Sequence, residues 1–93
     1  MQTTLPRRVR ISDEVLFQEI EGEGVLLNLS NEQYFGLNEI GTRIWHLLSE
    51  DVETAKTFDA LIKEYNVNQA TLKNDLSILI EELNNQGLVI IED

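Results

Sequence analysis

The stretch of sequence that decides the fold is residues 16–48, LFQEIEGEGVLLNLSNEQYFGLNEIGTRIWHLL. It contains short segments of strand-like composition, separated by polar turns, and ends in an amphipathic helical pattern. The strand-like segments are Val15–Glu21, Val25–Leu29 and Gln33–Leu37. Because the connecting turns are short, we expect these strands to pair with their neighbours as an antiparallel meander.

The first strand and its turn follow from alternation and from glycine. Leu16 and Ile20 fall on one face of the strand, and two glutamates fall on the other face. The turn Glu21–Gly24 contains two glycines, which tolerate the positive φ that tight hairpins need. The turn Ser30–Glu32 then leads the chain into its third strand.

Three helices are expected after the strands. Asn38 is a good N-cap for the first, and we expect Thr57 to cap the second and Asn68 the third. Gly87 ends the third helix, and Leu88–Ile91 then forms a short strand. The apolar residues at helical spacing are Ile40, Ile44, Leu47 and Leu48 in the first helix, Phe58, Leu61, Ile62 and Tyr65 in the second, and Leu72, Leu76, Leu79, Ile80 and Leu83 in the third.

These elements predict an α+β fold. A three-stranded antiparallel β-meander is followed by a winged-helix-like three-helix bundle with a short C-terminal strand. The winged-helix likeness rests on two helices joined by the tight turn at Asn66 and Val67 and followed by a strand. Residues 1–11 are expected to be a flexible segment or a marginal edge strand, and residues 12–93 a single domain.

Charge argues against a nucleic-acid partner. The formal net charge of the chain is −10, and residues 11–93 carry four cations against 17 acids. Affinity for nucleic acid depends largely on Lys and Arg that neutralise phosphates, so a surface this acidic repels it. Only Arg7, Arg8 and Arg10 favour the alternative, a small winged-helix DNA-binding regulator.

The composition also argues against catalysis. The chain has no cysteine, one histidine (His46) and glycines that occur singly at turns and caps. Thiolate chemistry, a multi-histidine metal site and a phosphate-cradling loop are therefore excluded. We expect no enzymatic activity, no cofactor and no metal. Residues 1–10 contain no apolar run and no segment approaches a membrane span of ~18 apolar residues, so a cytoplasmic protein is expected.

The third strand suggests peptide binding instead. Between Glu32 and Asn38 it has no Lys, no Pro and no carboxylate, the devices that normally keep an edge strand from pairing. An extended peptide could therefore bond to its backbone and gain specificity from side-chain pockets. The alternative is that Tyr34, Phe35 and the third helix's leucines are simply core, and the residues alone leave this open.

Several runs of the sequence are similar to those of a known protein family. The runs VLLNL at 25–29, YFGLNEIG at 34–41 and IW at 44–45 resemble the PqqD-like family, as does the pattern DLxxLIxxLxxxGL over 75–88. The resemblance covers roughly residues 12–91. It implies a three-strand sheet followed by a winged-helix-like trio of helices. It also implies a recognition element that binds the leader segment of a ribosomally made precursor peptide.

The resemblance further implies where the leader binds and which kind of enzyme receives it. The leader would add as a strand beside the third strand and deliver the precursor to a separate leader peptidase or modifying enzyme. The run YFGLNEIG looks most like the stand-alone leader-binding proteins of lasso-peptide clusters. A chaperone of another modified-peptide pathway, PQQ-like or radical-enzyme, is the alternative, although Ser30–Gln33 replaces the Pro-Glu-Gly type turn of the PQQ chaperones. The peptide-binding residues would be Gln33, Tyr34, Phe35, Gly36, Leu37, Asp75, Leu76, Leu79, Ile80 and Leu83.

Overall fold

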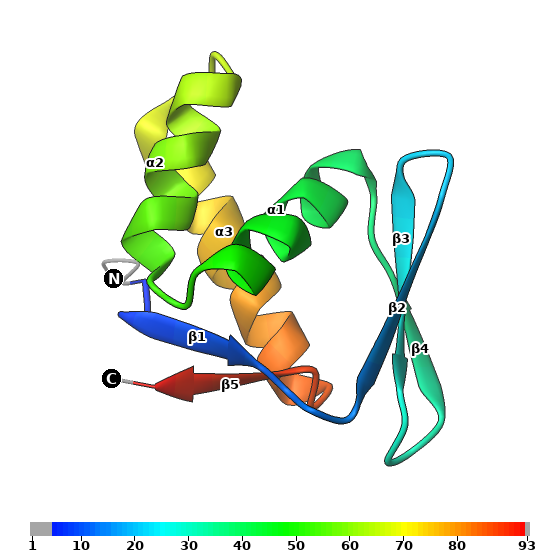
Figure 1. The fold of residues 1–93 in the computed structure, drawn as a ribbon. Coiled ribbons are helices and arrows are strands. Elements are labelled where there is room, and N and C mark those ends of the chain that lie inside the picture. Colours follow the sequence, from blue (N-terminus) through cyan, green and yellow to red (C-terminus); the bar gives the residue numbers. More distant parts are fainter. Residues whose placement is uncertain (1–4, 93) are drawn as a thin grey trace.

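The predicted α+β fold is confirmed in the computed structural model, which describes residues 5–92 (Figure 1). Over these residues the chain forms a three-stranded sheet, three helices and a separate two-stranded sheet. In chain order the elements are β1 (Arg8–Ile11), β2 (Val15–Ile20), β3 (Glu23–Asn28), β4 (Gln33–Gly36), α1 (Glu39–Glu50), α2 (Thr54–Glu64), α3 (Gln69–Asn85) and β5 (Val89–Glu92).

The expected meander is present, with strand order β2-β3-β4 and antiparallel pairing throughout. The first turn is tighter than expected, because β3 already begins at Glu23. Its two turn residues, Glu21 and Gly22, have φ of 53° and 83°. Positive φ at both central residues is the geometry that matches the twist of a two-residue hairpin. The register that results pairs Leu16 with Leu27 and Leu27 with Tyr34.

The N-terminal part of the chain contains a strand rather than a flexible segment. Arg8–Ile11 is not a flexible segment but strand β1, which pairs antiparallel with β5. Its other side is held as well, because the Val9 amide donates to the Val52 carbonyl at 2.8 Å. Val9 itself is 0% exposed. Of the two expectations for residues 1–11, the flexible segment is wrong for residues 8–11, which form the alternative, a strand. Residues 1–4 lie outside the described part of the chain.

Two of the three expected helix caps are confirmed. The side chain of Asn38 accepts from the Gly41 amide at 2.8 Å, and that of Asn68 from the Thr71 amide at 3.1 Å. Thr57 does not cap α2, which begins three residues earlier at Thr54. Thr57 is instead a buried residue inside the helix. Gly87, with φ of 72°, ends α3 as predicted.

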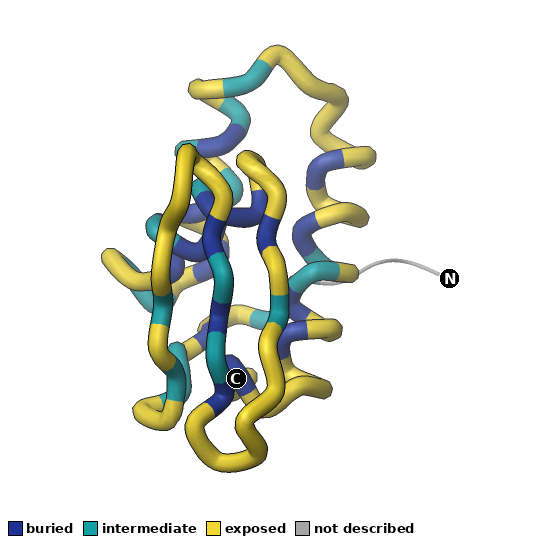
Figure 2. The backbone as a smooth tube through the Cα atoms, turned by 90° about the vertical axis from the view of Figure 1, so that its right-hand side faces the viewer, coloured by how far each residue is buried: buried dark blue, intermediate teal, exposed yellow. Residues whose placement is uncertain are grey.

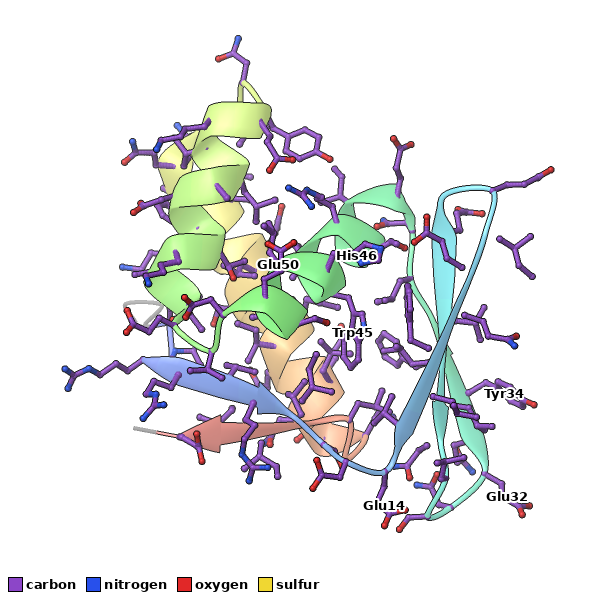
Figure 3. All side chains as sticks on the ribbon, viewed as in Figure 1. Glu14, Glu32, Tyr34, Trp45, His46 and Glu50 are labelled. Carbon is purple, nitrogen blue, oxygen red and sulfur yellow. The ribbon has the colours of Figure 1, made fainter. Side chains whose placement is uncertain are left out.

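Helix α1 lies between the meander and the α2–α3 pair (Figure 1). Figure 3 shows Trp45 of α1 pointing toward the sheet, where its ring stacks on Phe17 with the centroids 6.3 Å apart. The hydroxyl of Thr42, also on α1, accepts from the Gly24 amide at 2.7 Å. His46 reaches the same sheet, since its Nε2 lies 2.7 Å from Oε1 of Glu19. One face of the meander is thus covered by α1.

The opposite face of the meander is open. Leu16 is 53% exposed and Ile20 66%, so these two apolar residues of β2 point to solvent while Phe17 and Glu19 face α1. The alternation predicted which residues share a face but did not reveal which face is covered. Figure 3 shows Tyr34 on this same open side, away from the helices.

Helices α1 and α2 are joined on the surface by a two-pronged ion pair. Nε of Arg43 donates to Oε1 of Glu64 and Nη2 to Oε2, both at 2.8 Å. These hydrogen bonds stabilise the carboxylate and hold the pKa of Glu64 below its ordinary value. Because both groups are open to solvent, the pair orients the helices more than it stabilises the fold.

We predict that Val9→Ala destabilises the protein, because β1 belongs to the core. Removing two buried methyl groups should lower the free energy of unfolding by about 1.5–3 kcal/mol. Arg8→Ala, on the exposed side of the same strand, should change it by no more than about 0.5 kcal/mol. Urea unfolding followed by circular dichroism measures both. Equal stability of the two variants would mean that β1 is not part of the folded unit.

Candidate functional site

Strand β4 is an edge of the three-stranded sheet, and its outward backbone groups can be identified. The Leu37 amide donates to the Gly24 carbonyl at 2.8 Å, so these two residues form a hydrogen-bonded pair. In an antiparallel ladder hydrogen-bonded pairs alternate with non-bonded pairs. With the register observed, Tyr34 and Gly36 therefore turn their N–H and C=O groups away from β3. These backbone groups face the open edge of the sheet.

A groove of about 380 Å³ lies beside this edge. Figure 2, in which the meander faces the viewer, shows α3 running alongside β4. One wall is β4 and the segment after it, the other wall is α3, and the first turns of α1 close the groove between them. The lining residues are Phe35, Gly36, Leu37, Asn38, Ile40, Gly41, Ile44, Asp75, Leu79 and Glu82.

Local contacts hold the two walls in place. At one end, Nδ2 of the buried Asn28 donates to the Gln86 carbonyl at 2.8 Å and ties β3 to the C-terminus of α3. At the other end, Asn38 caps α1 and sets the path of the chain from β4 into the helix. Elsewhere α3 packs mainly against α2 and β5. The side of α3 that faces β4 is consequently left to line the groove.

The structure brings together half of the residues expected to bind peptide. Phe35, Gly36, Leu37, Asp75 and Leu79 all line the groove. Gln33 and Tyr34 lie on β4 but outside the groove, and Tyr34 is 73% exposed on the open face of the sheet.

The remaining three predicted residues are core. Leu76 and Leu83 are 0% exposed and Ile80 is 1% exposed. The expectation that Leu76 and Leu83 build pockets for a peptide is wrong, because both lie beneath the surface and neither lines the groove. A single helical stripe cannot serve both purposes. Leu79, which precedes Ile80 on the helix, is the one left partly open.

Other lining residues were missed by the sequence analysis. Ile40 and Ile44 were read as one apolar stripe of α1, but Ile40 is 46% exposed at the mouth of the groove. Their position directly after the unguarded strand was the available signal. Glu81 and Glu82 are neighbouring acids of α3, but only Glu82 lines the groove.

The ionisable side chains that line the groove are Asp75 and Glu82. Within residues 5–92, no three His, Cys, Asp or Glu side chains are placed to hold a metal ion together. Over the same residues, no helix has both the length and the apolar character needed to cross a membrane. What the site does offer is free backbone, apolar side chains and two carboxylates, which are the means of binding a peptide.

Comparison with known proteins identifies the family. The model of the family described as coenzyme PQQ synthesis protein D (PqqD) matches residues 23–89. The chain belongs to the PqqD family. No curated protein sequence matches it. Two solved structures have a similar fold, and both are complexes with a leader peptide.

The first is TbiB1 in complex with the TbiA(beta) leader peptide. It is 40% identical, with a TM-score of 0.82, and the match covers 86% of this chain and 93% of TbiB1. The second is lasso peptide synthetase B1 complexed with the leader peptide, at 23% identity and a TM-score of 0.79. That match covers 89% of this chain and 98% of the other, and it supports the fold alone. The resemblance to the PqqD-like family is confirmed.

We predict that Leu76 and Leu79 respond differently to truncation, although they are only three residues apart on α3. Leu76→Ala should lower the free energy of unfolding by about 2–5 kcal/mol, since it leaves a cavity in the core. Leu79→Ala should cost less than half as much, because that side chain is already partly in contact with solvent. Urea titrations of the two variants test this, and equal losses would place Leu79 in the core.

Proposed function

We propose that this protein is a non-catalytic adaptor that binds the leader region of a ribosomal precursor peptide in lasso-peptide biosynthesis. The leader adds as a fourth strand at β4, and the adaptor presents it to a separate leader peptidase or modifying enzyme. The observation that carries the proposal is the free edge of β4 beside an apolar groove, in a chain 40% identical to a protein bound to a leader peptide.

The binding mode follows from the chemistry of the edge. The N–H and C=O groups of Tyr34 and Gly36 supply up to four backbone hydrogen bonds to an added strand and set its register. Alternate side chains of that strand point toward the helices. There they meet Phe35, Leu79 and Ile40, which form an apolar surface at the groove. Apolar anchors therefore provide most of the affinity, and the backbone provides direction and register.

The first test is a calorimetric titration of the full chain with the leader of a precursor encoded in the same gene cluster. We expect saturable one-to-one binding in the nanomolar to low-micromolar range. A scrambled leader of the same composition should give no saturable heat. Absence of binding by both peptides would refute the proposal. Addition of the separate peptidase should then yield faster leader removal with the adaptor than without it.

Strand addition has its own test at Gly36. Gly36→Pro removes an outward N–H without touching the β3–β4 ladder, and proline is tolerated at such edge positions. It should weaken leader binding by at least about tenfold, because a backbone hydrogen bond of ~0.5–1.5 kcal/mol is lost and the ring blocks the partner strand.

Gly36→Ala is the matched control. A Cβ at this position meets no atom within 4 Å, so the variant should fold and bind like the parent protein. Circular dichroism of both variants establishes that the fold is intact. Equal affinities of the proline and alanine variants would mean that the leader is held by side chains rather than as an added strand.

A further inference from the structure

The groove carries charge of one sign only. Two of its lining residues are ionisable, Asp75 and Glu82, and both are carboxylates on α3. With Leu79 they fall at positions i, i+4 and i+7, so all three lie on one side of the helix. The rise of 1.5 Å per residue separates the two carboxylate positions by about 10 Å along the helix axis. Along the α3 wall of the groove an apolar side chain, Leu79, therefore lies between two acidic ones, Asp75 and Glu82.

Both carboxylates are available to a ligand. Of the described residues, the acids that take part in ion pairs are Glu19, Asp51, Glu64 and Glu92, and all of them lie outside the groove. Asp75 and Glu82 make no ion pair within residues 5–92, and both side chains are exposed. No Lys or Arg lines the groove to neutralise them. A bound peptide with Lys or Arg would supply the positive charge that the lining residues lack.

We propose that Asp75 and Glu82 make the groove selective for a leader segment with basic side chains on both sides of an apolar anchor. The inference rests on the proposed function and specifies the class of leader that the same site accepts. Side chains two residues apart on one face of a strand are about 7 Å apart. A strand with its anchor over Leu79 thus brings Lys or Arg at the neighbouring same-face positions within reach of both carboxylates, given the length of those side chains.

The test is to neutralise each carboxylate and measure the affinity for the leader of the cluster's precursor. Asp75→Asn and Glu82→Gln should each weaken binding about two- to fivefold at low salt, the range of exposed ion pairs. The loss should shrink as salt rises from about 50 mM to about 500 mM, because such pairs are screened. Both substitutions keep the size of the side chain, so the groove keeps its shape.

Glu81→Gln is the matched control. Glu81 is the neighbour of Glu82 and equally a solvent-exposed acid of α3, but it does not line the groove. Its neutralisation changes the net charge of the protein by the same amount. A local contact predicts a loss for Glu82→Gln and none for Glu81→Gln, whereas a general attraction between an acidic protein and a basic peptide predicts equal effects.

Substitutions in the peptide complete a double-mutant cycle with the substitutions in the protein. Replacing the leader's basic residues by alanine one at a time should identify one whose loss has no further effect in Glu82→Gln or in Asp75→Asn. Equal binding by the parent protein and both groove variants would overturn the selectivity while leaving the proposed function in place. A tightly bound leader without Lys or Arg would overturn it as well. Failure of the parent protein to bind any leader would instead refute the proposed function.

Discussion

The packing of α1 against one face of the meander is the contact on which the rest of the structure depends. At its centre β3 comes so close to α1 that a Cβ on Gly24 would stand 3.2 Å from Oγ1 of Thr42, and only 2.5 Å from the ring of Phe17 on β2. The Gly24 amide instead donates to Thr42, and Trp45 stacks on Phe17 beside it. In so small a domain one buried contact of this kind must both hold the sheet and place it relative to the remaining helices.

The groove is a consequence of this arrangement. Since α1 lies between the meander and the α2–α3 pair, α3 packs on α2 and β5 and runs beside β4 rather than against it. Asn28 joins β3 to the end of α3 and fixes how far apart the two walls stand. An edge strand with free backbone and a helix with partly open apolar residues then face each other across a gap. An extended peptide with apolar side chains fits that gap in both chemistry and shape.

The local elements could be predicted because their signals are local. Asn38 and Asn68 cap their helices through side chains that reach their own first turn, and Glu21 with Gly22 makes the hairpin. Strand β1 was harder, because Arg8–Ile11 is held by β5 and by the segment before α2, which lie some 80 and 40 residues away along the chain. Thr57 shows that a local signal can also mislead. Its side chain suits a helix cap, but α2 begins at Thr54 and Thr57 lies inside the helix.

The sequence by itself determined the order of the elements from β2 onward, the pairing of the meander, the family and the unguarded character of Gln33–Leu37. These follow from turn residues, hydrophobic periodicity and the absence of charge, all of which act over a few residues. Only the tertiary structure decided which residues the site uses. Leu76 and Leu79 have the same side chain on the same helix, and Glu81 and Glu82 have the same charge. The direction each one faces is set by where β4 and α1 lie, and that depends on packing between distant parts of the chain.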